Sequence, residues 1–144
     1  MNSLVETASR LLQLAIAFAL ALPIAWDRER SERSAGLRTF TLVAISTCAL
    51  LIAARSSLAS VDAQSRVWQA LLTGTGFIGS GAILKTDRQV RGTATAASPW
   101  STAAMGAAVA YEAYDIAIVL RVANFVVLRW LAPLKVEKVT EFPR

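Results

Sequence analysis

The chain has 144 residues, enough for one domain, and 55% of them are hydrophobic, with a mean hydropathy of +0.48. This composition is far more apolar than that of an ordinary soluble protein, and it predicts a membrane protein. The formal net charge is +5, but the basic residues lie between long apolar segments and not on the face of a soluble module, which argues against nucleic-acid binding. Histidine is absent, which excludes imidazole metal ligands and histidine-dependent catalysis.

Cysteine usage and the motif content also argue against an enzyme. Cys48 is the only cysteine, so an intrachain disulfide is excluded, and we interpret this residue as a small buried residue of a helix. The sequence contains neither a nucleophile elbow nor a phosphate-binding loop. We therefore expect a non-enzymatic protein without a cofactor or a bound metal.

The first apolar segment covers residues 11–26, after a short polar start. Sixteen helical residues extend about 24 Å, which is short for a bilayer core of about 30 Å unless flanking side chains snorkel. A secretory signal peptide is the alternative, because Ala19-Leu20-Ala21 is similar to a cleavage site. However, Glu6 offsets Arg10 and leaves no positive region before the apolar segment, so we expect a retained transmembrane helix.

Four more apolar segments follow, separated by a charged loop at 27–38, a polar linker at 56–65 and a basic turn at 85–92. These segments are residues 39–54, 67–84, 93–111 and 116–132. The sequence thus predicts an all-α, polytopic membrane bundle of about five transmembrane helices over residues 1–132. Residues 133–144 form a short tail that we expect to be cytoplasmic.

The third segment carries four glycines within eight positions, Gly74, Gly76, Gly79 and Gly81. Each glycine disfavours a helix in water by up to about 1 kcal/mol relative to alanine, so close packing must hold this helix. At 100° per residue, Gly74 and Gly81 fall within about 20° of each other, and the other two lie on the opposite side. We therefore predict that this helix is central, with neighbours against both faces. A ligand or ion site at the glycines is the alternative.

The fourth segment consists mainly of Ala, Thr, Ser and Gly, so it is also expected to pack closely on its neighbours. Pro99 is expected to kink it. Trp100 is expected to line a gap between helices.

The distribution of positive residues predicts the orientation. With the N-terminus outside, eleven of the fifteen lysines and arginines fall in the inner segments and three in the outer ones. Trp26 and Trp130 then lie at the inner boundary, and Trp68, Tyr111 and Tyr114 lie at the outer one. The C-terminus is therefore predicted to be cytoplasmic.

The charged loops suggest a cluster at the inner mouth of the bundle. Asp27 and Glu29 follow the first apolar segment, where the helix dipole disfavours anions, and Arg91 precedes the fourth segment, where it disfavours cations. We hypothesise that Asp27 and Glu29 pair with Arg38 and Arg91. The alternative is a solvated loop with local ion pairs of little energy. A metal site at the two carboxylates is less favoured because guanidinium groups compete for them.

Two polar residues interrupt the fifth segment. Arg121 lies near its middle, where an arginine costs at least about 2.5 kcal/mol, and Asn124 shares its helical face. Ala117 keeps this face narrow. The stripe is therefore predicted to point into the bundle or a subunit interface. Snorkelling of Arg121, or a fifth helix lying flat at the membrane surface, are the alternatives.

Three motifs, in this order, resemble the MgtC/SapB family of bacterial inner-membrane proteins. They are Gly36-Leu37-Arg38-Thr39, the glycine pattern with Phe77 and Ile78, and Val90-Arg91-Gly92 followed by Thr95-Ala96-Ala97 and Trp100. Residues 24–29 are similar to the Ile-Gly-Leu-Glu-Arg-Glu turn of that family. Ala25, Asp27 and Phe40 depart from it, standing where glycine, glutamate and histidine are usual. The resemblance covers residues 11–111, and the soluble C-terminal domain of longer members is not matched.

The resemblance implies a multi-pass protein of the bacterial inner membrane that takes part in adaptation to low magnesium and, in pathogens, in survival within the host. One branch of the family is thought to restrain the proton-driven ATP synthase, which implies a regulatory role with a membrane-protein partner. Besides that partner and the lipid bilayer, a homo-oligomer is possible. The alternative is a cation transporter or channel for magnesium, although the apolar segments contain no Asp or Glu to coordinate a cation.

Overall fold

The computed structural model describes residues 2–30, 36–81, 83–86, 89–91 and 93–130. These residues form five helices and one short hairpin. The elements are α1 (Asn2–Arg30), α2 (Leu37–Ser57), α3 (Val61–Ser80), β1 (Leu84–Thr86), β2 (Gln89–Arg91), α4 (Thr93–Ala110) and α5 (Tyr114–Trp130). The predicted all-α bundle is confirmed. The basic turn between the third and fourth helices contains an antiparallel hairpin in which Lys85 is paired with Val90.

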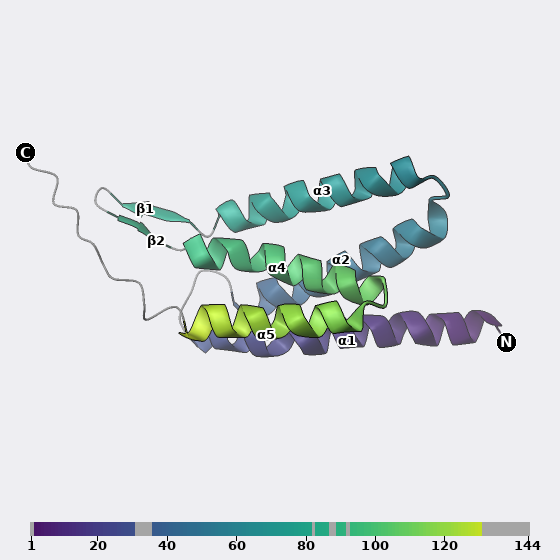
Figure 1. Ribbon diagram of the computed structural model, residues 1–144, viewed down its shortest axis with the longest axis horizontal. Helices are drawn as coiled ribbons and strands as arrows, with labels where there is room; N and C mark the ends of the chain where they lie inside the picture. The colour runs from purple at the N-terminus through teal and green to yellow at the C-terminus, as the bar shows by residue number, and fades with distance from the viewer. Residues whose placement is uncertain (1, 31–35, 82, 87–88, 92, 131–144) are drawn as a thin grey trace, which may run out of the picture.

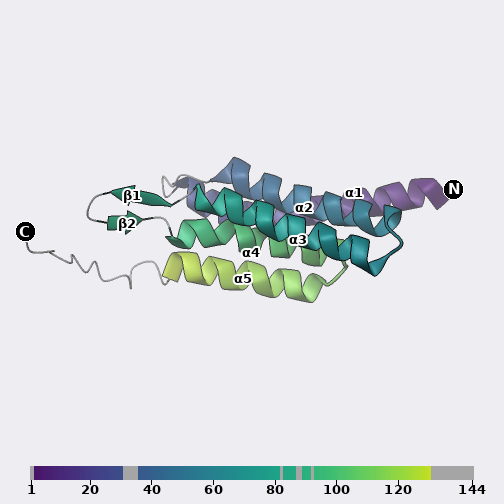
Figure 2. The same cartoon turned by 90° about the horizontal axis from the view of Figure 1, so that it is seen from above.

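The helices run alternately up and down along one long axis (Figures 1 and 2). We call one end of the bundle the hairpin end; there α1, α3 and α5 finish and α2 and α4 begin. The opposite end carries the N-terminus of α1, which extends beyond the other helices (Figure 1). An odd number of alternating helices places the start of α1 and the end of α5 at opposite ends.

The central helix is α4, so the prediction that the glycine-rich helix is central is wrong. Helix α4 packs against each of the other four helices, whereas α3 lies at the edge and packs chiefly on α4. Every residue from Met105 to Ala110 is buried. Apart from Met105 and Val109, this part of α4 contains only alanine and glycine, so neighbouring helices can approach it closely. In α3, the glycines alternate with exposed large side chains such as Phe77 and Ile78.

Two glycines account for the closest helix contacts. A Cβ atom on Gly106 of α4 would collide with the carbonyl oxygen of Ala44 in α2, and one on Gly79 of α3 would collide with that of Ala96 in α4. By contrast, a Cβ atom on Gly74 or Gly76 would meet no heavy atom of the described chain within 4 Å. Only part of the glycine pattern is therefore used for packing inside the bundle.

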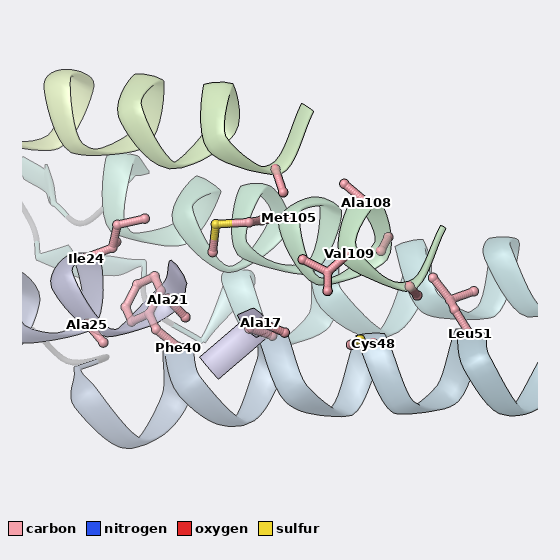
Figure 3. Close-up of a cluster of buried hydrophobic side chains, with 14 of the residues drawn as sticks. Ala17, Ala21, Ile24, Ala25, Phe40, Cys48, Leu51, Met105, Ala108 and Val109 are labelled. Carbon is pink, nitrogen blue, oxygen red and sulfur yellow. The ribbon is translucent and has the colours of Figure 1, made fainter. Parts of the chain in front are cut away.

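The core contains mainly alanine with a few larger side chains between the helices. Figure 3 shows Phe40 of α2 near Ala21 and Ala25 of α1, and Met105 and Val109 projecting from α4. Cys48 is buried in this core as a free thiol, as the sequence predicts. Other prominent buried members are Ala17, Ile24, Ala44, Leu51, Ala107 and Ala117. Such a core allows the backbones to approach closely, as between helices in lipid.

Two details of α4 follow from its surroundings. Pro99 lies inside the helix, which continues as one element from Thr93 to Ala110. The side chain of Trp100 is 49% exposed, so it lies on the surface and does not fill a gap between helices as expected. The large indole cannot enter a crossing that small residues have closed.

The exterior of the bundle is apolar. Large exposed side chains cover α1, α2, α3 and α5; on α5 they include Ile116, Ile118, Val119, Val122 and Val127. Contiguous apolar surface of this kind favours a lipid environment over water. Two helices are long and apolar enough to cross a membrane: α1 over Ser3–Arg30, with 28 residues, and α2, with 21. Five membrane passes stay a prediction.

Candidate functional site

A charged cluster joins α1 to α5 at the hairpin end. The Asp27 carboxylate accepts a hydrogen bond of 2.5 Å from Arg28 Nη2 and one of 3.1 Å from Arg129 Nη1. Arg28 Nη2 also donates to the carbonyl oxygen of Leu128, at 3.1 Å. We call Asp27, Arg28, Arg129 and the Leu128 carbonyl the Asp27 cluster. The cationic Arg28 thus lies at the C-terminal end of α5, where a positive charge is favoured by the helix dipole.

Glu29 binds the backbone at the start of α2. Its Oε2 accepts a hydrogen bond of 2.8 Å from the backbone N–H of Leu37. A carboxylate is favoured at a helix N-terminus, where the first backbone N–H groups lack partners within the helix. A Cβ atom on Gly36 would collide with the Glu29 carboxylate, so another residue at that position would force the Glu29 side chain to move from this contact. The Gly36-Leu37 pair is therefore explained by the contact between α1 and α2.

The described contacts of these two carboxylates do not include Arg38, and the predicted pairing with Arg91 stays a prediction because the Arg91 side chain lies outside the described residues. In the described contacts, Asp27 binds Arg28 and Arg129, and Glu29 binds the α2 backbone. Arg38 is exposed at the start of α2. The side chain of Arg91 and the residue Gly92 lie outside the described part of the chain.

Sequence reasoning missed the two arginines that bind Asp27. Arg129 belongs to the last turn of α5, which an up-and-down bundle places at the same end as the last turn of α1. The predicted helices already imply that the last turns of α1 and α5 lie at the same end of the bundle. They do not specify which helices are adjacent there. The hypothesis from the sequence instead paired the two carboxylates with Arg38 and Arg91.

The predicted polar stripe on α5 has Asn124 and Ala117 buried in the bundle and Arg121 half-buried. The direction of the stripe therefore agrees with the prediction for Asn124. Within the described part of the chain, Asn124 Nδ2 and Arg28 Nε are buried donors without a hydrogen-bond acceptor. A functional role for Arg121 and Asn124 stays a prediction.

A second cluster lies at the opposite end and was not predicted. Arg55 Nη1, in the last turn of α2, donates a 2.6 Å hydrogen bond to the Ala110 carbonyl at the end of α4. Its guanidinium lies 4.8 Å from the Tyr111 ring centroid. Trp68 Nε1 donates to the Tyr111 hydroxyl at 3.2 Å, and these two rings are 5.7 Å apart. This cluster connects α2 and α3 to the end of α4. Trp68 and Tyr111 are thus in contact at one end of the bundle, and that this end is the outer one stays a prediction.

The exposed side of α3 borders a groove of about 410 Å³ between α2 and α3. Gly74, Thr75 and Ile78 line it from α3, and Leu42, Thr47 and Leu50 from α2. The hydroxyl of Thr75 donates to the carbonyl oxygen of Leu71 at 2.7 Å, within its own helix. The groove is therefore suited to van der Waals contact with an apolar group.

Among the described residues, no three or more His, Cys, Asp or Glu side chains lie together in a group that could hold a metal ion. The chemistry of the two clusters is that of Arg, carboxylate and backbone carbonyl groups at helix ends. Such contacts fix the helices relative to one another.

A small-residue core, an apolar exterior and ionic contacts at the helix ends define a helical membrane protein. Comparison with known families specifies it further: the family model described as "MgtC family" matches residues 14–136, and the chain belongs to this family. The family resemblance stated from the motifs is thereby confirmed.

Several curated proteins are similar to the chain. Protein SrpB of Synechococcus elongatus is 36% identical over 120 residues, which cover 74% of the chain and 66% of SrpB. Protein MgtC of Brucella abortus is 44% identical over 94 residues, or 65% of the chain and 39% of that protein. A protein of Escherichia coli K12 named "Putative magnesium transporter YhiD" is 31% identical over 129 residues, or 85% and 60%. The chain thus spans about two fifths to two thirds of the length of these relatives. No solved structure matches.

Proposed function

We propose that the chain is a regulatory, non-enzymatic membrane domain that binds another membrane protein through the exposed surface of α3. The observation that carries this proposal is the open space beside Gly74 and Gly76. Helices associate in lipid where small residues allow their backbones to approach, and these glycines serve no such contact within the described part of the chain.

The position of α3 supports the same function. The helix lies at the edge of the bundle, and Gly79 fixes it against Ala96 of α4. The exposed surface of α3, which carries Gly76 and borders the 410 Å³ groove at Gly74, is therefore available to a helix of a partner. By family resemblance, the partner is a membrane complex such as the proton-driven ATP synthase, and the physiological setting is adaptation to low magnesium in the bacterial inner membrane.

Filling the open space beside Gly76 tests this proposal. The variant Gly76→Leu places a large side chain where the described chain leaves open space, so we expect its folding to be preserved. The matched control is Ala123→Leu, on the exposed surface of α5. We expect a membrane partner to co-purify with the wild type and with the control, and to be lost from Gly76→Leu at unchanged thermal stability. Equal recovery of the partner with all three proteins would contradict the proposal.

A magnesium transporter is the second candidate, and the name of the Escherichia coli relative favours it. In that case Arg121 and Asn124 are candidates to line the path. Purified protein in liposomes separates the two functions. Magnesium flux above that of empty vesicles supports transport, and a co-purified partner without flux supports regulation.

A further inference from the structure

A cleft of about 310 Å³ lies between α1 and α5 at the hairpin end. Its apolar wall includes Leu22 and Trp26 of α1 and Phe125 of α5. Arg30 and Arg129 line the same cleft from the last turns of these helices. The cleft thus combines an apolar wall with two guanidinium groups at a helix end.

We propose that this cleft binds an anionic phospholipid, with its phosphate between Arg30 and Arg129 and an acyl chain along Leu22, Trp26 and Phe125. Guanidinium groups bind phosphate oxygens through charge-assisted, bidentate hydrogen bonds. Basic pockets between helices at the membrane surface are suited to acidic lipid headgroups. The inference is independent of any protein partner.

The two arginines are held over aromatic rings. The Arg30 guanidinium carbon lies 5.7 Å from the Trp26 ring centroid, and that of Arg129 lies 6.0 Å from the Phe125 ring centroid. These cation–π contacts place the charged groups beside the apolar wall. Both side chains are exposed, so the guanidinium groups are accessible from outside the bundle.

The charge balance favours an anion even though Asp27 also lines the cleft. The Asp27 carboxylate accepts hydrogen bonds from Arg28 and Arg129, so its charge is compensated within the Asp27 cluster. Among the described residues that line the cleft, two guanidinium groups, Arg30 and Arg129, stand beside this one carboxylate, which leaves an excess of positive charge. A phosphodiester, which carries one negative charge, reduces this excess.

The apolar wall distinguishes a lipid from a soluble phosphate. An inorganic phosphate would use the two arginines alone, whereas a phospholipid also covers the exposed surfaces of Leu22, Trp26 and Phe125. Trp26 lies at a predicted membrane boundary, the depth at which headgroup and acyl chain meet. We therefore assign the cleft to a lipid of the adjoining leaflet.

Native mass spectrometry of the purified full chain tests the assignment. Phosphatidylglycerol and phosphatidylethanolamine are titrated against the wild type, the double variant Arg30→Gln/Arg129→Gln and the control Arg10→Gln/Arg66→Gln at the opposite end. We expect the wild type and the control to bind phosphatidylglycerol about tenfold or more tightly than phosphatidylethanolamine, and the cleft variant to lose this preference. The single variant Arg30→Gln removes no described hydrogen bond, so a partial loss in this variant at unchanged thermal stability excludes misfolding as the cause.

Three results would overturn the proposal. The first is equal binding of the two lipids by the wild type. The second is an unchanged lipid preference in the cleft variant. The third is displacement of phosphatidylglycerol by inorganic phosphate at concentrations similar to that of the lipid, which would identify a soluble anion as the ligand.

Discussion

Asp27 is a single carboxylate that connects two helices distant in sequence. Its side chain is 16% exposed and binds both Arg28 of its own helix and Arg129 of α5. Arg28, in turn, is 5% exposed and therefore depends on its acceptors within the protein. A buried guanidinium that loses its carboxylate retains the full cost of its desolvation.

We therefore expect Asp27→Asn to destabilise the protein by about 2 kcal/mol or more, because Arg28 then lacks its anionic partner. Thermal unfolding in detergent is the measurement. Asp62→Asn is the control: its pair with Arg66 is exposed, with side chains 77% and 76% accessible, and we expect a change within about 0.5 kcal/mol. Equal stability of the two variants would show that the Asp27 cluster does not hold the helix ends.

Glu112 has a backbone conformation that glycine normally occupies. Its φ is 61°, two residues after the end of α4 at Ala110. The Glu112 N–H donates to the Val109 carbonyl at 3.0 Å, and the Ala113 N–H donates to the Ala108 carbonyl at 2.9 Å. This pattern is a Schellman ending with a left-handed residue, which costs a residue with a Cβ atom about 1 kcal/mol.

Replacing Glu112 by glycine is therefore expected to raise the stability by about 0.5 to 1 kcal/mol, because the left-handed conformation becomes unstrained. The readout is the apparent unfolding temperature in detergent. Glu112→Ala removes the carboxylate and keeps the Cβ atom, so it controls for charge. A rise of the same size in the alanine variant would assign the effect to the charge and contradict the argument from strain.

At the scale of the helices, the structure separates glycines that pack from glycines that do not. Gly79 and Gly106 each face a carbonyl oxygen of a neighbouring helix, and Gly74 and Gly76 face open space. The sequence does not distinguish the two kinds, because a glycine that faces a neighbour and one that faces lipid have the same spacing in a helix.

Alanine substitutions at these positions are expected to differ in sign. Gly79→Ala and Gly106→Ala force two helices apart at a backbone contact, so we expect each to cost about 1 to 3 kcal/mol. Gly74→Ala and Gly76→Ala are expected to be neutral or to stabilise by up to about 1 kcal/mol, since alanine favours the helix. Thermal unfolding of the four variants is the measurement. Similar losses at all four positions would restore the view that α3 has neighbours on both faces.

The sequence predicted the number, order and approximate positions of the helices, because long apolar segments and charged loops are strong local signals. It also predicted that residues 93–111 pack closely. It did not predict that α4 is central. That position depends on the mostly small residues of α4. The glycines of α3 are more conspicuous in the sequence, but two of them, Gly74 and Gly76, are exposed.

The candidate site was predicted less completely than the fold. Asp27 and Glu29 were identified by their unfavourable position at a helix C-terminus, and both do make contacts between elements. Arg129 could not be identified from the sequence as a partner of Asp27, because this contact depends on which helices are adjacent at the hairpin end. Arg55 was missed for the same reason, since its acceptor, Ala110, lies 55 residues away along the chain.

At the scale of the whole molecule, the alternation of five helices places the two ends of the bundle on opposite sides if every helix crosses the membrane. The positive residues predict that the hairpin end is cytoplasmic. Two exposed positions can report on this orientation: Glu6 near the start of α1, and Arg38 at the start of α2.

We expect a membrane-impermeant thiol reagent to label Glu6→Cys in intact cells and to label Arg38→Cys only after permeabilisation. Both variants are made in a Cys48→Ala background, which removes the native thiol. Labelling of Arg38→Cys from the outside would reverse the orientation. Labelling of both positions from the same side would contradict a membrane-crossing α1.

The central position of α4 also constrains how the chain assembles during synthesis. α1, α2 and α3 leave the ribosome before α4, yet α3 packs chiefly on α4, and α2 on both α1 and α4. α1 and α2 are apolar enough to enter the bilayer as a first pair. α3 therefore lacks its principal packing neighbour, α4, until translation has passed Ala110. A nascent chain arrested before that point would expose an incomplete bundle to membrane quality-control proteases.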